Sequence, residues 1–148
     1  MSKKIAVISA SWHVPIVGSA EDSFVKTMVE AGYDRADIKV IKVPGALEVP
    51  LAGKKALENG FDAAVGIAFV VDGGIYRHEF VAHTALQSIL DVSMETGKPF
   101  LSVVISPQNF KEGDPDDETW FVDHFVIKGR EAAEACMQML NVLPEIKA

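Results

Sequence analysis

The chain has 148 residues, the size of one globular domain, and 49% of them are hydrophobic, toward the apolar end for a soluble protein. No apolar run approaches the ~18 residues that cross a bilayer, so the sequence predicts no membrane segment. The formal net charge of −7 argues against nucleic acid or an anionic membrane as the general partner, because both bind basic surfaces.

Other global features indicate location and assembly. Cys136 is the single cysteine, so no intramolecular disulfide can form, and the chain fits a reducing compartment. The opening Met-Ser-Lys-Lys runs directly into a strand pattern, which leaves no room for a signal peptide and predicts a cytoplasmic location. The excess of apolar residues suggests a subunit interface, since obligate interfaces resemble a domain core cut in half.

The first half of the chain alternates apolar runs with helical patterns. We expect strands over Lys4–Ala10 and Ile38–Val43, with a loop over Ser11–Val17 after the first of them. A helix is expected from about Ser19, a possible N-cap, to a stop at Gly32. The break at Pro44-Gly45 is followed by a second helix, over Leu47–Asn59.

The second half continues the alternation. We expect a strand over Ala63–Val71, a helix over Arg77–Thr96 and a strand over Phe100–Ser106. The acidic, breaker-rich stretch Pro107–Trp120 is predicted to be a long loop before a last helix over Lys128–Leu140. Such alternation predicts an α/β fold, a single three-layer αβα sandwich over residues 1–148, with a four-stranded parallel sheet of flavodoxin-like topology.

The helix expected over Arg77–Thr96 carries two apolar stripes. One contains Val81, Ala85, Ile89 and Val92, and the other contains Ala82, Leu86 and Leu90. Two stripes imply that this helix is covered on more than one side.

Residues that can carry chemistry follow the first three predicted strands. Trp12 could present a flat aromatic face, although a core tryptophan is the commoner interpretation, and Glu48 lies near the start of the second helix. Asp72-Gly73-Gly74 offers backbone N–H groups for an anion such as phosphate, although a plain glycine turn explains the same residues. Neither a nucleotide P-loop nor a dinucleotide fingerprint occurs. Ligands of parallel α/β folds bind beyond the carboxyl ends of the strands, so one shared site is expected there.

Arg77, His78 and His83 open the third helix. His78 and His83 are five residues apart, about 140° around a helix, so they do not share a face and a metal site is disfavoured. An imidazole exchanges protons near neutral pH, which suits His78 for acid–base work, and a guanidinium can bind phosphate. A solvated helix start is the competing interpretation of both residues.

Three motifs resemble those of the lumazine synthase (6,7-dimethyl-8-ribityllumazine synthase) family. They are Pro-Gly-Ala-Leu-Glu-Val-Pro over Pro44–Pro50, Ala-Phe-Val-Val-Asp-Gly-Gly over Ala68–Gly74, and Glu-Thr-Gly-Lys-Pro over Glu95–Pro99. The similarity covers nearly the whole chain, and Trp12 with the string Asp72–His78 resembles the second, decameric type of the family. The resemblance implies a transferase of riboflavin biosynthesis that condenses 5-amino-6-(D-ribitylamino)uracil with 3,4-dihydroxy-2-butanone 4-phosphate, without a cofactor, giving the lumazine, phosphate and water. It also implies pentamers, paired into a decamer, with the active site between subunits.

The resemblance assigns roles to individual positions. It places Trp12 on the pyrimidine ring, and Phe69, Val70 and Val71 beside that ring. The stretch Ala46, Leu47 and Glu48 would hold the ribityl chain, and the turn with Gly74 and Ile75 would bind phosphate. Ser102 matches the position where a neighbouring subunit usually contributes an aromatic residue.

Two positions depart from the commoner pattern of the family. Arg77 stands where the catalytic histidine is expected, with His78 one residue later, and Trp120 stands where a phosphate-binding arginine is expected. His124 falls on a lysine position. The resemblance therefore favours His78 as the proton donor, and Arg77, the Gly73-Gly74 turn and His124 as ligands of the phosphate. Two alternatives stay open: an archaeal-type riboflavin synthase of the same fold, and a flavin- or lumazine-binding assembly with little turnover.

Overall fold

The computed structural model describes residues 2–72 and 77–148, which form four strands and four helices. The strands are β1 (Ile5–Ala10), β2 (Ile38–Val43), β3 (Ala63–Phe69) and β4 (Phe100–Ile105). The helices are α1 (Val14–Glu30), α2 (Val49–Glu58), α3 (His78–Thr96) and α4 (Pro115–Val142), with short 3₁₀ turns over Arg35–Asp37, Ala46–Glu48 and Leu143–Glu145.

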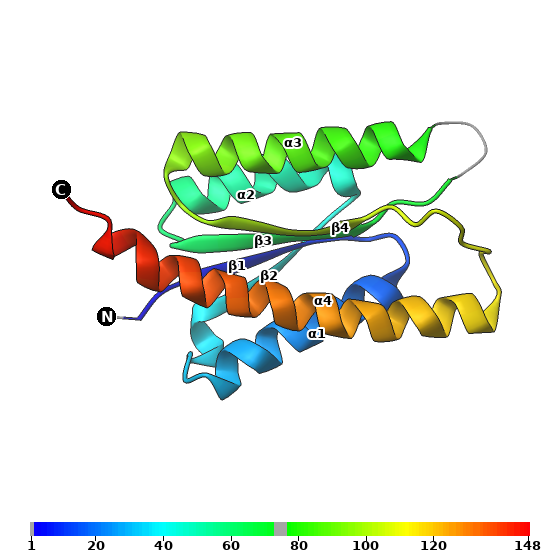
Figure 1. Ribbon diagram of the computed structural model, residues 1–148, viewed down its shortest axis with the longest axis horizontal. Coiled ribbons are helices and arrows are strands. Elements are labelled where there is room, and N and C mark those ends of the chain that lie inside the picture. Colours follow the sequence, from blue (N-terminus) through cyan, green and yellow to red (C-terminus); the bar gives the residue numbers. More distant parts are fainter. Residues whose placement is uncertain (1, 73–76) are drawn as a thin grey trace.

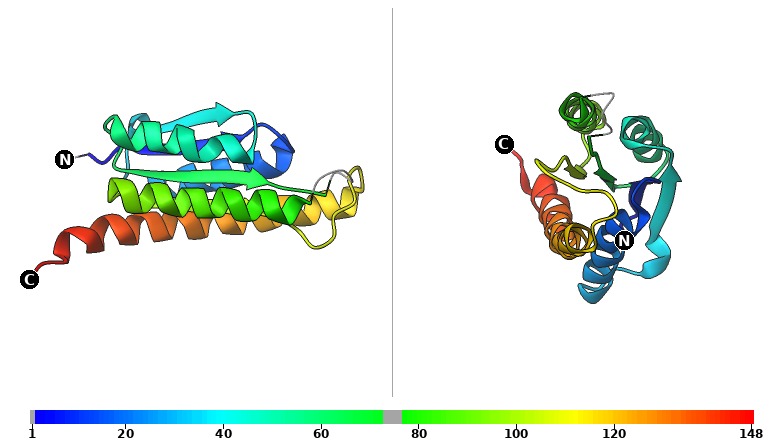
Figure 2. Two further views of the ribbon diagram at one scale, coloured as in Figure 1. Left: turned by 90° about the horizontal axis from the view of Figure 1, so that it is seen from above. Right: turned by 90° about the vertical axis from the view of Figure 1, so that its right-hand side faces the viewer.

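The four strands form one parallel sheet in the order β2-β1-β3-β4. Helices α2 and α3 cover one face of the sheet, and α1 and α4 cover the other (Figure 1). The predicted αβα sandwich with a four-stranded parallel sheet and flavodoxin-like order is therefore confirmed. Because the strands are parallel, their carboxyl ends meet at one edge, and both chain termini lie at the opposite end (Figure 2).

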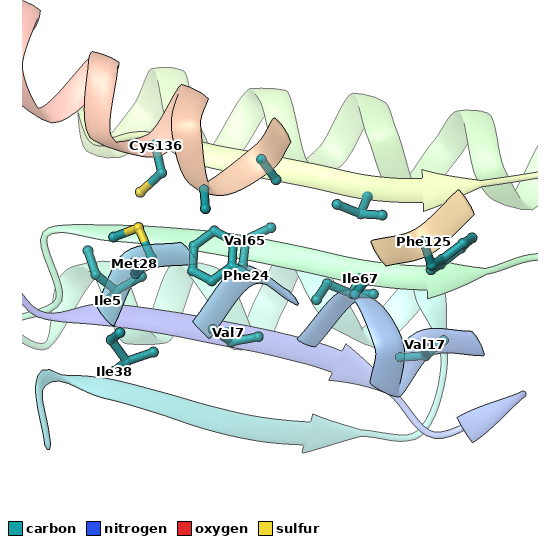
Figure 3. Close-up of a cluster of buried hydrophobic side chains, with 14 of the residues drawn as sticks. Ile5, Val7, Val17, Phe24, Met28, Ile38, Val65, Ile67, Phe125 and Cys136 are labelled. Atoms are coloured by element: carbon teal, nitrogen blue, oxygen red, sulfur yellow. The ribbon is translucent and has the colours of Figure 1, made fainter. Parts of the chain in front are cut away.

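The core lies on both faces of the two central strands. Every residue of β1 and β3 is buried, which explains why their sequences are continuous apolar runs. On the α1/α4 face, Phe24 and Met28 of α1 and Phe125 and Cys136 of α4 belong to one buried cluster over the sheet, in which Met28 lies near Cys136 (Figure 3). On the opposite face, Phe100 fits against two glycines, Gly53 of α2 and Gly66 of β3, where an added Cβ would lie 2.2 Å and 3.3 Å from its ring.

Helix α1 begins at Val14, so the prediction of a loop to Val17 and a helix start near Ser19 was wrong. Pro15 lies in the first turn, where proline is favoured because its missing N–H has no partner to lose. The Ser19 hydroxyl does not cap the helix but donates to the carbonyl oxygens of Ile16 (2.7 Å) and Val122 (2.9 Å). Ser19 thus joins α1 to α4.

Helix α4 begins at Pro115, 13 residues before the predicted start at Lys128. The Asp114 carboxylate accepts hydrogen bonds from the backbone N–H groups of Asp116 (2.9 Å) and Asp117 (3.3 Å). The acidic residues that suggested a loop form the first helical turn, where the helix dipole favours negative charge. The predicted loop is therefore reduced to the residues between Ile105 and Pro115.

Smaller differences concern strand and helix ends. β3 ends at Phe69 instead of Val71, and β4 ends one residue earlier than expected, at Ile105. The residues Ala46–Glu48 form a 3₁₀ turn, and α2 itself begins at Val49. Such ends are the least certain part of a pattern-based prediction, since hydrogen-bond partners decide them.

The Glu95–Pro99 motif has a structural role. Gly97 adopts a left-handed conformation (φ 68°) and ends α3. The Lys98 ammonium then donates to the carbonyl oxygens of Leu57 (2.7 Å) and Phe61 (2.9 Å), satisfying acceptors at the end of α2. This motif therefore ties α2 and α3 together at the end of the sheet opposite the strand carboxyl ends.

We expect Cys136 to be chemically inert in the folded chain. It is fully buried between α4 and the sheet, and burial raises the pKa of its thiol to about 12, so almost no reactive thiolate exists at neutral pH. Ellman's reagent should leave the native protein unmodified and label about one thiol per chain after unfolding in guanidinium. Fast labelling of the native protein would contradict this placement.

Candidate functional site

A pocket of about 530 Å³ lies at the carboxyl ends of β1 and β3, between the starts of α2 and α3. This is the place where open parallel sheets bind ligands. Its lining is mostly apolar with a few polar side chains: Ala10, Trp12, His13, Gly45, Ala46, Leu47, Glu48, Ala68, Phe69, Val70, Val71, His78 and Val81. The structure thus brings together residues that the sequence placed after three different strands.

Trp12 gives the pocket its aromatic surface. Its side chain is 68% exposed, so it is not the core tryptophan that was the commoner interpretation. The indole lies beside Gly45, where an added Cβ would be 3.7 Å from Nε1. An exposed indole next to a glycine leaves a flat face free for a planar ring.

The 3₁₀ turn Ala46–Glu48 forms the wall of the pocket on the β2 side. It is closed by the Glu48 N–H, which donates to the Gly45 carbonyl oxygen (3.2 Å). The Glu48 carboxylate folds back over Gly45, with Oε1 3.2 Å from where a Cβ would stand. A Cβ at position 45 would crowd the Glu48 carboxylate and would meet the Trp12 indole at ordinary van der Waals distance.

The end of β3 forms the floor. Phe69 is buried, while Val70 and Val71 are half-buried and follow the last residue of the strand. The Val70 N–H donates to the Ile105 carbonyl oxygen of β4 (2.9 Å), which continues the sheet pairing one residue past β3. This floor is apolar and held by backbone hydrogen bonds, as suits a site for a flat heterocycle.

Of Arg77 and His78, the two residues predicted to carry the chemistry at the start of the third helix, His78 lines the pocket. It opens α3, its side chain is 19% exposed, and Nδ1 lies 3.4 Å from Glu79 Oε2. A hydrogen bond from its own backbone N–H, followed by one from Arg77, lowers the pKa of the Glu79 carboxyl. The Glu79 carboxylate therefore lies between the Arg77 guanidinium and the His78 imidazole at the start of α3.

Arg77 is not among the residues that line the pocket. Its Nε donates to Glu79 Oε1 (2.9 Å), and the guanidinium carbon lies 4.6 Å from the Phe80 ring centroid. The side chain is largely exposed, so the guanidinium is held by Glu79 and Phe80 at the surface beside the pocket. The predicted phosphate turn, with Gly73, Gly74 and Ile75, lies outside the described residues.

Ser102 and His124 lie away from this pocket in the same chain. Ser102 is exposed on β4, in a second hollow with Lys128 and Glu131. His124 of α4 stacks on Trp120, with ring centroids 4.9 Å apart, in a third hollow that also includes Gln108 and Asn109. The structure thus divides the predicted residues into a group at the β1–β3 ends and a group on the β4/α4 side.

The lining residues that the sequence interpretation missed as candidates include His13 and Gly45. Both were noted only as parts of a loop or a motif. Their signal was position, because each adjoins a predicted site residue at the end of a strand. Val81, which was assigned to a core stripe, also reaches the pocket.

Within residues 2–72 and 77–148, no group of three or more His, Cys, Asp or Glu side chains is placed to hold a metal ion. No helix among these residues has the length and apolar character needed to cross a membrane.

Comparisons with known proteins show the family of this chain. The family model described as 6,7-dimethyl-8-ribityllumazine synthase matches residues 2–144. The chain is 41% identical over 147 residues to 6,7-dimethyl-8-ribityllumazine synthase 2 of Pseudomonas syringae pv. tomato, covering 99% of this chain and 86% of that protein. It is 40% identical over 146 residues to 6,7-dimethyl-8-ribityllumazine synthase of Rhodococcus erythropolis, covering 96% and 94%. A synthase 2 of Bradyrhizobium diazoefficiens is 38% identical over 146 residues, covering 98% of this chain and 87% of that protein. The chain therefore belongs to the 6,7-dimethyl-8-ribityllumazine synthase family.

Proposed function

We propose that this chain catalyses the reaction of its family in riboflavin biosynthesis, joining 5-amino-6-(D-ribitylamino)uracil to 3,4-dihydroxy-2-butanone 4-phosphate with release of phosphate and water. The observation that carries the proposal is the pocket in which Trp12, Glu48 and His78 converge at the strand ends. The amine of the first substrate attacks the carbonyl of the second, so the protein needs no nucleophile of its own. Its work is to position two molecules and to move protons.

The lining suggests how the pyrimidine substrate is held. The indole of Trp12 stacks on the ring, and the apolar end of β3 at Phe69, Val70 and Val71 lies beside it. The ribityl hydroxyls meet the turn Ala46–Glu48, where the Glu48 carboxylate accepts their hydrogen bonds. The apolar surfaces thus orient the ring, and the polar group fixes its chain.

Residues at the start of α3 donate the proton and help to bind the phosphate group. His78 is the proton donor, because its imidazole lines the pocket beside the charged Glu79. The phosphate group is held by the turn with Gly74 and Ile75, by Arg77 beside the pocket, and by His124. Arg77 exchanges its exposed pair with Glu79 for the dianionic phosphate, which its planar guanidinium fits better.

In this proposal, the residues on the β4/α4 side, Ser102 and His124, contribute to the active site of a neighbouring subunit. Ser102 and His124 lie outside their own chain's pocket and complete the pocket of the next copy in a ring of five, two rings forming a decamer. Large apolar side chains on the outer side of α3 support assembly: Phe80, Leu86, Leu90 and Met94 are exposed. Native mass spectrometry tests this arrangement, and a stable monomer would contradict a shared site. The cytoplasmic location stays a prediction of the sequence.

Turnover is the direct test of the function. Purified protein is mixed with the pyrimidine and the butanone phosphate, and lumazine absorbance is followed together with phosphate release. We expect both signals to rise well above the rate of the spontaneous reaction. A rate equal to the spontaneous one would favour a binding assembly, and conversion of the lumazine itself to riboflavin would favour a riboflavin synthase.

Replacing Arg77 by Ala should raise the KM for the butanone phosphate by about tenfold, because one charge-assisted contact to phosphate is lost. The KM for the pyrimidine should stay within about twofold, since Arg77 does not line the pocket that holds the ring. Arg130→Ala is the matched control, because Arg130 is an exposed arginine on α4 paired with Glu134. Equal KM values for Arg77→Ala and the control would refute the role of Arg77.

A further inference from the structure

His13 has an unusual backbone conformation next to the pocket. Its φ of 52° and ψ of 54° are left-handed, and among residues 2–72 and 77–148 no other non-glycine residue has a positive φ. Histidine enters this region more readily than most residues, yet the conformation is strained and persists only where the surroundings hold it. The His13 carbonyl accepts hydrogen bonds from the N–H groups of Ile16 and Val17 (both 3.0 Å) and starts α1.

The side chain of His13 is held inside the protein. It is 14% exposed and packs edge-on against the rings of Phe69 (5.4 Å between centroids) and Phe110 (5.7 Å). These two phenylalanines also contact each other at 5.0 Å, and both touch Phe121 of α4. His13 Nε2 lies 3.8 Å from Glu112 Oε1. The imidazole is therefore fixed within an aromatic cluster that joins the end of β3 to α4.

Ser11 holds the other side of Trp12. Its hydroxyl donates to the Val43 carbonyl oxygen at the end of β2 (2.7 Å), and its backbone N–H donates to the Pro44 carbonyl oxygen (3.4 Å). Trp12 thus lies between one residue attached to β2 and one residue attached to β3 and α4. Ser11 and His13 are both anchored by these contacts, while the Trp12 side chain between them is exposed to solvent.

We propose that Ser11 and His13 form a clamp that holds the Trp12 indole ready over the pocket, which makes His13 a positioning residue for recognition of a planar ring. This role rests on the proposed function, because the ring that meets Trp12 is the pyrimidine of the substrate. A tryptophan on a free loop would lose rotational freedom each time the ring binds, and this loss would weaken binding. A clamped tryptophan has already lost that freedom on folding, so binding does not carry the cost. Beside the left-handed turn at His13, the imidazole packs in the cluster at the rim of the pocket, and the Trp12 indole stays exposed at the same pocket.

The test uses Trp120→Phe as the parent chain, so that fluorescence comes from Trp12 alone. His13→Asn is introduced because asparagine also tolerates the left-handed backbone but cannot fill the place of the ring. We expect the steady-state anisotropy of Trp12 to fall without ligand, and the KM for the pyrimidine to rise about tenfold. The KM for the butanone phosphate should change by less than about twofold. His83→Asn, an exposed histidine on α3, is the matched control.

Unchanged anisotropy in His13→Asn, or an equal rise of both KM values, would overturn the clamp. If His13→Asn does not fold, as judged by circular dichroism, Ser11→Ala is measured in the same way, since it removes one hydrogen bond and leaves the aromatic cluster intact. There we expect a smaller rise in the pyrimidine KM, and no rise would overturn the clamp. If the unsubstituted chain shows no turnover, the proposed function fails, and the anisotropy comparison in the Trp120→Phe background still decides the clamp.

Discussion

His78→Gln is expected to lower kcat by roughly a hundredfold, the typical effect of removing a general acid–base group. Glutamine keeps a polar side chain of similar size but cannot transfer a proton near neutral pH. His78 carries the role because it lines the pocket and lies 3.4 Å from the Glu79 carboxylate, while Arg77 is not among the lining residues. Stopped-flow measurement of lumazine formation at saturating substrates gives the value.

His83→Gln provides the matched control for this prediction. His83 lies on the same helix five residues later, is exposed and does not line the pocket. Its kcat should stay within about twofold of the parent value. Equal rates for His78→Gln and His83→Gln would show that proton transfer does not depend on His78 and would leave positioning as the main contribution of the protein.

The strand pattern predicted the sheet well because the sheet is buried on both faces. β1 and β3 lie at its centre and contain only buried residues, so their sequences cannot be mistaken for amphipathic elements. The position of the site followed from the same fact, since residues after parallel strands meet at one edge. Trp12, Glu48 and His78 could thus be grouped from the sequence alone.

The helix starts could not be placed equally well, because a proline and a run of acidic residues have two interpretations. Pro15 and Pro115 both lie in a first helical turn, where they are compatible with the helix, but the same residues also occur in loops. The signal missed at α4 was Asp114 directly before Pro115, a capping residue followed by a proline. Acidic residues in the first turn interact favourably with the helix dipole, so they stabilise the helix and do not indicate a loop.

The roles of His13 and of the β4/α4 residues depend on contacts that no local pattern contains. The His13 side chain packs on rings that are about 60 and 100 residues away in sequence, Phe69 and Phe110. Ser102 and His124 lie outside the pocket of their own chain, so their use requires a second subunit. Sequence reasoning found these two positions only through the resemblance to a family.

Gly129→Ala is expected to destabilise the fold by about 2–3 kcal/mol, the second large effect that the structure predicts. An added Cβ at Gly129 of α4 would lie 2.4 Å from the backbone carbonyl oxygen of Ala20 and 3.0 Å from its Cα, both in α1. Neither atom can move without shifting a helix, because Ser19 and Ser23 bond the carbonyls of Val122 and Val126 across the same contact. Thermal unfolding should show a midpoint lowered by roughly 5–10 °C.

Gly18→Ala is the matched control, since Gly18 is a glycine in α1 with nothing within 4 Å of an added Cβ. Alanine there should stabilise the chain by about 0.5–1 kcal/mol, because glycine in a helix loses more backbone entropy on folding. Both substitutions replace glycine by alanine within a helix. Opposite changes in the free energy of unfolding would therefore report the close approach of α1 and α4 at Gly129. A stabilised Gly129→Ala variant would mean that the two helices pack further apart than this structure shows, and that small residues at the contact are not required.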